Sequence, residues 1–380
     1  MMKTEFDWSL LSNNINGISP KWVSHRTHFL TIHGSRAYST NIESSDTDYR
    51  GICIGPKELY LGSSSNFEQL TLNEKTDAVI FEIRKFIQLA VKCNPNALEI
   101  IFTDPQHHLI MTSVGRKLID NRDLFLSRAA RQTFHGYAHA QAARISSHKR
   151  WLMNPPAKKP EREDFNLSKN YTEIASEQLN AVFAMIAKKN DEWNWHDLEL
   201  TSMADRLRIQ EEFNRRLFEI TQSTIDELSF MSACRVLGFS DNFIELLNKE
   251  KQYRSAVKEW DQYQTWVKNR NPKRAELEAK FGFDLKHAVH LVRLSRSCYE
   301  LLSTGKLNVN RAGIDADELL AIRNGAWTYE QLETWFEEQA TRNREAEKNS
   351  PLPKTCDMEK IDKLCIELIE ECLRVDFDAK

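Results

Sequence analysis

In this 380-residue chain, the residues whose types and spacing most directly indicate a functional site are Asp46 and Asp48, two aspartates separated by one residue. They precede a β-like run, residues 49–54, and side chains two residues apart on a strand lie on the same face of a sheet. Two carboxylates held so close repel each other unless a cation lies between them. Mg²⁺ prefers oxygen ligands and bridges carboxylates to substrate phosphates. The pair therefore predicts a divalent-metal site.

A Gly34-Ser35 pair ends a second β-like run, residues 29–33, and ten residues separate Ser35 from Asp46. Glycine lets a backbone approach a ligand closely, and amide groups at a helix start can hold a phosphate. We therefore expect Gly34, Ser35 and Arg36 to contact the phosphates of a nucleotide. Gly-Ser and Asp-x-Asp are each common in ordinary loops, but their positions beside two β-like runs favour a nucleotidyl-transfer site.

The Gly-Ser turn, the ten-residue gap and the Asp-x-Asp pair together resemble the signature of the DNA polymerase β nucleotidyltransferase superfamily. Within it, residues 34–38 (Gly-Ser-Arg-Ala-Tyr) and 45–51 (Ser-Asp-Thr-Asp-Tyr-Arg-Gly) are similar to a polymerase-β-like family associated with RNA repair. The other segments that resemble this family are residues 82–90, 94–99, 151–165, 286–294 and 319–327. Two residues depart from the pattern. Ser39 stands where glycine is usual, and Thr47 where an apolar residue is usual, but neither change removes a ligand.

The resemblance implies a third carboxylate on a neighbouring strand. Asp77 opens a short β-like run that we expect to pair antiparallel with the Asp46/Asp48 strand. Glu82, at the expected junction between that run and a helix, is the alternative. In the implied reaction, Asp46, Asp48 and Asp77 bind one or two Mg²⁺ ions, with Mn²⁺ as an alternative, which bridge an NTP. Ser35 and the neighbouring amides would hold the outgoing phosphates.

Two groups of residues are candidates for binding an acceptor. The first lies in a basic segment, residues 144–162, whose candidate acceptor-binding residues are Lys149, Arg150 and Trp151. The cations of this segment, set against the single acid Glu161, are Arg144, Lys149, Arg150, Lys158, Lys159 and Arg162. Positive charge beside an exposed aromatic ring suits single-stranded nucleic acid, which needs phosphate contacts and a stacking surface. The second repeats at helical spacing on one face and comprises Lys286, His290 and Arg293. For each group the alternative is an ordinary solvated surface paired with acids.

The elements that must position these residues divide the chain in two. Residues 1–110 hold short β-like runs at 29–33, 49–54 and 78–81, followed by helical spacing over 81–92. From residue 111 the spacing predicts helices over 114–121, 123–151, 171–190, 203–218, 223–237, 241–270, 284–303, 315–323, 328–347 and 358–374. We therefore expect an α+β fold. A small mixed-sheet nucleotidyltransferase domain would occupy residues 1–110, and a larger all-helical domain, with a possible acceptor-binding region, residues 111–380.

Composition narrows the class of protein. The net charge of −3 excludes a wholly basic nucleic-acid-binding protein, so an RNA partner would have to bind a local patch. Seven cysteines without Cys-x-x-Cys spacing argue against a zinc framework and favour reduced thiols. The chain has no apolar run of about 18 residues and no signal-peptide pattern, so we expect a cytoplasmic protein that does not enter a membrane.

The expected activity is transfer of a nucleoside monophosphate from an NTP to an acceptor, and the resemblance implies that this acceptor is an RNA end. Two alternatives stay open. One is transfer to a protein hydroxyl, as some members of the superfamily do in toxin–antitoxin systems. The other is a non-catalytic module that binds NTP or RNA. The intact Asp46/Asp48 pair argues against the non-catalytic module, because a degenerate site has no reason to retain two repelling carboxylates.

Overall fold

The computed structural model describes residues 6–8, 21–43, 45–63, 66–72, 77–169, 175–192, 225–270 and 272–378. The chain forms two compact units. Unit 1 comprises Met1–Lys149 and Glu276–Lys380, and unit 2 comprises Arg150–Ala275. Unit 2 is thus inserted in the sequence of unit 1. The division of function between residues 1–110 and 111–380 stays a prediction, since compactness does not reveal what a segment binds.

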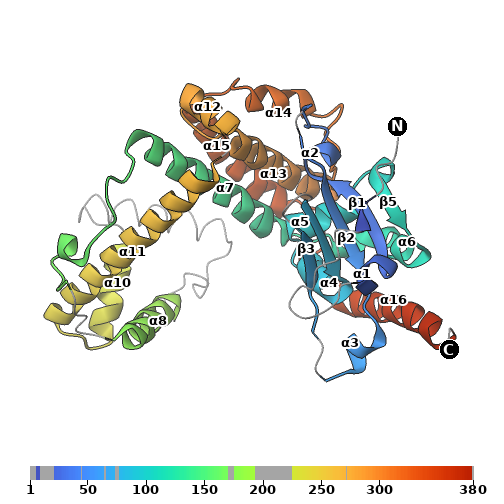
Figure 1. The fold of residues 1–380 in the computed structure, drawn as a ribbon, viewed down its shortest axis with the longest axis horizontal. Helices are drawn as coiled ribbons and strands as arrows, with labels where there is room; N and C mark the ends of the chain where they lie inside the picture. Colours follow the sequence, from blue (N-terminus) through green and yellow to red (C-terminus); the bar gives the residue numbers. More distant parts are fainter. Residues whose placement is uncertain are drawn as a thin grey trace. The chain divides into compact units, whose positions relative to one another are not determined.

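Unit 1 contains a five-stranded mixed sheet (Figure 1). Its strands are β1 (Thr27–His33), β2 (Asp48–Cys53), β3 (Gln69–Leu72), β4 (Asp77–Glu82) and β5 (His108–Met111), in the order β3-β4-β2-β1-β5. β1 pairs antiparallel with β2 and β5, and β3 pairs antiparallel with β4. The sequence predicts β1, β2 and β4 to within two residues at each end. The four-residue strands β3 and β5 were not predicted because so short a run shows little periodicity.

One predicted pairing is wrong. β4 runs parallel to β2, not antiparallel, with Asp48 opposite Asp77 and Cys53 opposite Glu82. The reason is β3, which pairs antiparallel with the outer side of β4. The chain therefore reverses direction once more before it enters β4, and both aspartates come at the start of their strands.

Alternate side chains of the central strands enter different cores. Ile52 and Phe81 belong to a large core, which they share with helices α4 (Ile83–Val91), α5 (Pro95–Ile101), α6 (Ser113–Asp120), α7 (Ala130–Met153), α13 (Leu285–Thr304) and α16 (Met358–Asp378). Their neighbours Cys53 and Ile80 pack in a smaller cluster with Val23. Because both faces are covered, these strands carry nearly continuous apolar runs. Polar groups therefore gather where the strands end.

The other elements of unit 1 are short helices and turns around this core, together with the two longer helices α14 (Ala316–Arg323) and α15 (Tyr329–Lys348). The short elements are α1 (Lys21–His25), α2 (Gly34–Ala37), α3 (Lys57–Leu61), η2 (Pro105–His107) and η3 (Arg122–Phe125). Local sequence sets the ends of the helices. The Asn94 side chain caps α5 and the Asp284 side chain caps α13, by accepting main-chain N–H bonds. Gly305, with φ of 70°, ends α13.

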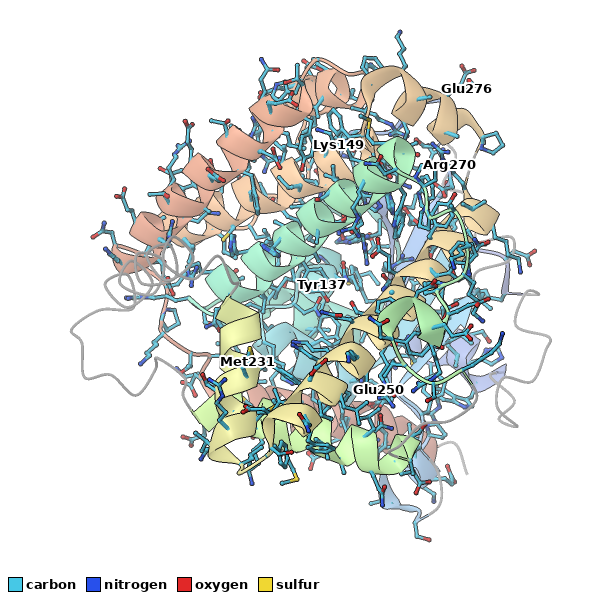
Figure 2. The ribbon with its side chains drawn as sticks, turned by 90° about the vertical axis from the view of Figure 1, so that its left-hand side faces the viewer. Tyr137, Lys149, Met231, Glu250, Arg270 and Glu276 are labelled. Carbon is cyan, nitrogen blue, oxygen red and sulfur yellow. The ribbon has the colours of Figure 1, made fainter. Side chains whose placement is uncertain are left out.

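Unit 2 contains helices α8 (Ser176–Glu192), α10 (Ile225–Val236) and α11 (Asp241–Asn269) and the turn η4 (Arg162–Phe165); α12 (Pro272–Phe281) spans its boundary with unit 1. Buried side chains of α8, α10 and α11, among them Leu179, Phe230 and Leu247, form its core. Met231 of α10 and Glu250 of α11 are labelled in Figure 2.

The predicted α+β class is confirmed: a small mixed sheet is followed by a mostly helical region. Most helices expected after residue 111 occur within a few residues of their predicted ends. α7 begins at Ala130, later than expected, because residues 122–125 form a 3₁₀ turn, and α12 was not predicted. The helix predicted over 203–218 lies outside the described residues. Within the described part, no helix combines the length and apolarity that crossing a membrane requires.

Candidate active site

Strands β2 and β4 bring two of the predicted carboxylates together. Asp48 and Asp77 are the first residues of these strands and face each other in the parallel register. Burial, then a hydrogen bond with the Asp77 side chain and the negative charges of Asp77 and Asp46, raise the pKa of Asp48 to about 6. Neighbouring like charges disfavour the ionised form of a carboxyl group. The starts of the two strands therefore concentrate negative charge at a place where a cation could bind.

Asp46 lies in an exposed position two residues before β2. The loop that carries it is held by Arg36, whose Nε donates to the main-chain oxygen of Asp46 (3.3 Å) and whose Nη2 donates to that of Ser45 (3.0 Å). In this structure Arg36, which we expected to contact nucleotide phosphates, therefore positions an aspartate loop.

The predicted Gly-Ser turn lies against the carboxylates. Gly34 begins α2 with φ of 65°, and a Cβ atom on it would lie 1.7 Å from Oδ2 of Asp48. Any side chain at residue 34 would therefore displace the Asp48 carboxylate, and a left-handed φ disfavours all residues except glycine. Ser35, half-buried, follows directly in α2. The structure thus brings Gly34 and Ser35 next to the aspartates.

A positive charge and a neutral imidazole adjoin this pair. Arg50 Nη1 forms an ion pair with Asp77 Oδ1 (3.0 Å) and also donates to the main-chain oxygens of Asp77 and Tyr49. His33 pairs with Asp48 across β1 and β2. Burial, followed by the charge of Arg50, lowers the pKa of His33 well below its ordinary value, so the imidazole is neutral. The spacing of the motif gave no role to His33, which only the antiparallel register identifies.

Glu82, the alternative third carboxylate, lies at the opposite end of β4. Four residues separate it from Asp77, and the five steps between them correspond to roughly 16 Å along a strand. Its side chain is 2% exposed and caps α4 by accepting from the main-chain N–H groups of Arg84 and Lys85. It also accepts a hydrogen bond from Tyr60 Oη (2.7 Å). These contacts give Glu82 a structural role, and the geometry favours Asp77.

A buried network of three polar side chains holds Tyr38, which follows the Gly34-Ser35 turn. Tyr38 Oη donates to Glu99 Oε2 (2.6 Å), and Glu99 forms an ion pair with Arg293, whose guanidinium lies 3.7 Å from the centre of the Tyr38 ring. All three side chains are buried. The structure thus places Arg293 in the core toward Glu99, and not on the solvent-facing surface that the prediction of an acceptor contact assumed. Sequence reasoning did not assign Glu99, a single acid among apolar residues of α5.

The helical part of unit 1 also holds the turn after α2. Ser39, which replaces the usual glycine, has φ of 57°, and its Oγ donates to Asn310 Oδ1 (2.8 Å). Arg323 Nη1 donates to the Thr40 main-chain oxygen (3.1 Å). The left-handed backbone explains why glycine suits residue 39. Residues 310–323 therefore position the motif although they lie far from it in the sequence.

The other members of the second basic group remain nearer the surface. Lys286 is exposed and His290 is half-buried. With Arg293 in the core, the three residues do not form one solvent-facing stripe. Lys149, from the first group, lies 3.5 Å from the centre of the Tyr329 ring and 3.6 Å from Glu330. Its charge is thus partly balanced within unit 1.

The stacking surface expected at Trp151 is absent. Trp151 is 6% exposed and lies in unit 2 between rings of α11, with ring centres 5.8 Å from Tyr263 and 5.6 Å from Trp266. Its Nε1 donates to Glu259 (3.3 Å), which also pairs with Arg150 (2.5 Å). Trp151 is buried because aromatic rings and an acid of α11 cover this segment.

Other cations of the basic segment that lie in unit 2 are also paired with acids. Arg162 forms an ion pair with the buried Glu250 of α11 (2.5 Å; Glu250 is labelled in Figure 2), and Lys158 pairs with Asp164 (2.7 Å). Acids on α11 and in η4 thus balance much of the charge that the sequence concentrates at residues 144–162.

Comparison with known proteins identifies a family for the first part of the chain. Residues 17–158 match the RlaP family, described as the RNA repair pathway DNA polymerase beta family. The matched segment contains the whole sheet, α2 and the three aspartates. Neither the curated proteins nor the solved structures gave a match. The match confirms the predicted resemblance to the RNA repair pathway DNA polymerase beta family over residues 17–158, and the resembling segments 286–294 and 319–327 lie outside it.

Proposed function

We propose that this chain is a divalent-metal-dependent nucleotidyltransferase, which moves a nucleoside monophosphate from an NTP to an acceptor. One observation carries the proposal: Asp48 and Asp77 meet at the start of two parallel strands, in contact with the Gly34 turn, with Asp46 two residues away. The family match supports the general class, a polymerase-β-like enzyme of RNA repair.

The donor set fits Mg²⁺. All three candidate ligands are carboxylates, the hard oxygen ligands that this ion prefers. The raised pKa of Asp48 marks a place where negative charge accumulates and where a positive ion would be favoured. Asp46, Asp48 and Asp77 would hold one or two ions, with Mn²⁺ as an alternative. Bound there, the ions would stabilise both the attacking and the leaving oxygen of the displacement.

The protein's own groups would then orient the reactants. Ser35 and the amides of Ser35 and Arg36 would bind the outgoing β- and γ-phosphates. Asp77 would lie on the acceptor side and take up the proton of the attacking hydroxyl. A bond forms between the acceptor oxygen and the α-phosphorus, the bond to the bridging oxygen breaks, and pyrophosphate leaves. Arg50, which pairs with Asp77 in this structure, would supply a positive charge beside the developing negative charge.

The proposed acceptor is an RNA end, because the matched family is one of RNA repair. The proposal includes a cytoplasmic location, where NTPs and RNA ends occur; all seven cysteines are free thiols. The structure offers no exposed aromatic surface at Trp151, so the acceptor-binding residues proposed are Lys149, Lys286 and His290, the less buried members of the two basic groups, together with Arg150.

The test is an acceptor assay. The full chain is incubated with Mg²⁺ and each α-labelled NTP, separately with mixed RNA and with cell-lysate protein. Label on RNA supports the proposal. Label on protein alone indicates transfer to a protein hydroxyl, and NTP binding without transfer to either indicates a non-catalytic module. The variants Asp46→Asn and Asp48→Asn are the controls, and unchanged transfer by either would refute the assigned site.

A further inference from the structure

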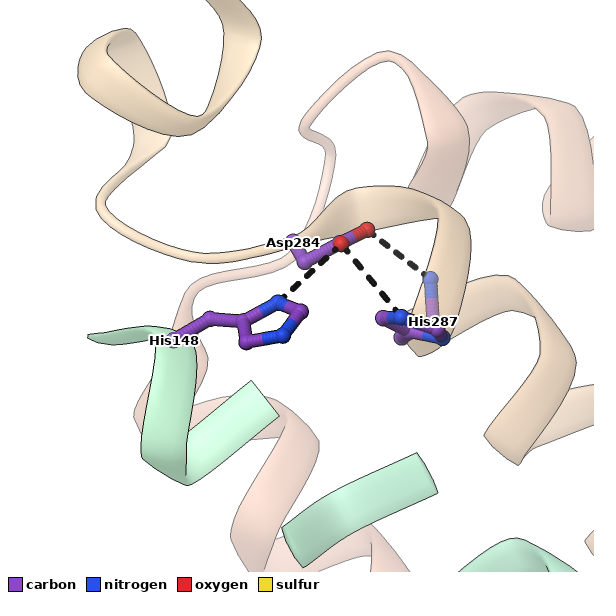
Figure 3. A group of neighbouring side chains, drawn as sticks. All are labelled: His148, Asp284 and His287. Atoms are coloured by element: carbon purple, nitrogen blue, oxygen red, sulfur yellow. Dashed lines mark hydrogen bonds and ion pairs between the residues drawn. The ribbon is translucent and has the colours of Figure 1, made fainter. Parts of the chain in front are cut away.

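Two helix ends of unit 1 bring together a histidine pair and a buried aspartate (Figure 3). His148 lies near the end of α7, Asp284 caps α13, and His287 lies in the first turn of α13. In sequence, the chain leaves unit 1 after Lys149 and returns at Glu276. The cluster therefore joins the two segments of unit 1 close to the points between which unit 2 is inserted.

The three side chains have the spacing of ligands around one ion. Asp284 Oδ2 lies 3.5 Å from His148 Nδ1 and 3.6 Å from His287 Nε2, and all three ligand atoms lie within 4.8 Å of one another. Ordinary N–H···O hydrogen bonds are shorter, about 2.7–3.2 Å. Tetrahedral ligands about 2.0 Å from a zinc ion are roughly 3.3 Å apart. The distances from Asp284 to the two imidazoles are close to this ligand–ligand distance.

Neighbouring contacts orient the ligand atoms. His287 Nδ1 lies 2.7 Å from Oε1 of Gln141, a contact in which the ring nitrogen donates and its Nε2 is left to face Asp284. Metal-binding histidines typically have such a hydrogen bond at the other ring nitrogen, which fixes the tautomer and the orientation of the ring. Asp284 Oδ1 accepts from the main-chain N–H of His287 (3.1 Å), so the carboxylate is fixed as well.

The burial of the Asp284 carboxylate gives a bound ion a stabilising role. The Asp284 side chain is 0% exposed, whereas the side chains of His148 and His287 are 14% and 16% exposed. Positive charge close to a carboxylate that is taken out of water stabilises it, and a divalent ion would add such charge. The partly exposed imidazoles leave a route by which an ion can enter.

We propose that His148, Asp284 and His287 form a binding site for a divalent transition-metal ion of the zinc class, which ties the end of α7 to the start of α13. Two imidazoles and one carboxylate suit Zn²⁺ and similar ions, and water would complete the coordination. Mg²⁺ requires oxygen ligands and is not expected to compete. The site is separate from the three aspartates of the sheet. The sequence gives no sign of it, because His148 lies far from the other two residues.

The experiment measures Zn²⁺ binding to the full chain by calorimetry, with Mg²⁺ in excess to saturate the aspartate site. The test variants are Asp284→Asn, which keeps a side-chain oxygen for the helix cap, and His148→Gln. The matched control changes His135 and His139 of the same helix to glutamine. Those two histidines lie four residues apart, with ring centres 6.3 Å apart.

We expect the wild-type chain and the control to bind one equivalent of Zn²⁺, with a rise in unfolding temperature. Each test variant is expected to lose at least tenfold in affinity and most of that rise. Gln141→Leu is expected to weaken binding about 10–100-fold through the lost ring contact. Two results would overturn the proposal: a wild-type chain that binds no Zn²⁺, or test variants that bind it as tightly as wild type. The second would point to the cysteines or to the aspartate site. If Asp284→Asn does not fold, His148→Gln alone decides.

Discussion

Replacement of Asp48 by asparagine should stabilise the metal-free protein at neutral and alkaline pH while it abolishes activity. Burial, the hydrogen bond with Asp77 and nearby negative charge raise the pKa of Asp48 from 3.8 to about 6. A raised carboxyl pKa adds stability below the ordinary pKa, and that stability is lost as pH rises through about 6. Asparagine does not ionise, so the variant escapes this loss.

The magnitude follows from the same values. A rise from 3.8 to about 6 corresponds to about 3 kcal/mol for a fully buried group. Asp48 is only half-buried, so solvent screening reduces the expected gain to about 1–1.5 kcal/mol. Asp46→Asn is the matched control because Asp46 is exposed, and we expect it to change the free energy of unfolding by no more than about 0.5 kcal/mol.

The assay is urea unfolding in the presence of a chelator, at about pH 4 and about pH 8, the two sides of the titration. Asp48→Asn should match wild type at the lower pH and exceed its free energy of unfolding at the higher pH. Both variants should lose nucleotidyl transfer when Mg²⁺ is restored. Two results would refute the reasoning. One is an Asp48→Asn variant that is less stable than wild type at the higher pH. The other is a variant whose free energy of unfolding differs from that of wild type by the same amount at both pH values.

Three further predictions concern the arrangement around these carboxylates. Gly34→Ala should abolish activity and cost about 1–2 kcal/mol in urea unfolding, since the methyl group meets a carboxylate oxygen and the backbone is left-handed; an active variant would contradict the turn geometry. Asp77→Asn should lose transfer but keep NTP binding, measured by calorimetry, whereas Glu82→Ala should cost about 1–3 kcal/mol of stability through its lost hydrogen bonds while the folded fraction stays active. The reverse pattern would make Glu82 the third ligand. Arg293→Met should destabilise the protein by about 3–5 kcal/mol because it strands a buried carboxylate, and Lys286→Met, at an exposed position, should change stability by less than about 0.5 kcal/mol; similar effects of the two would contradict the burial of Arg293.

Local patterns predicted the parts of the fold that local physics decides. Apolar runs and turn residues indicated β1, β2 and β4, and helical spacing indicated α13 and α15, since each signal is contained in the element itself. The direction of β4 was not predictable in this way. It depends on β3, whose four residues, Gln69–Leu72, alternate between polar and apolar over too short a run to identify a strand.

The candidate site was predicted in part for the same reason. Gly34, Asp48 and Asp77 are found together because Gly34 directly follows one recognisable strand, β1, and the two aspartates begin two others, β2 and β4. Trp151 and Arg293 were misplaced because a helical period shows which residues share a face but not what packs against that face. Burial of both residues depends on side chains distant in sequence: α11 covers Trp151, and Glu99 of α5 pairs with Arg293.

The central claim, nucleotidyl transfer at the three aspartates, is tested most directly by parallel reactions with α-labelled and γ-labelled NTP. The wild-type chain with Mg²⁺ and RNA should place the α label on the RNA and release the γ label as pyrophosphate. Chelation of the metal, or Asp48→Asn or Asp77→Asn, should abolish both. Transfer of the γ label to the acceptor, or full α-label transfer by either variant, would contradict the account.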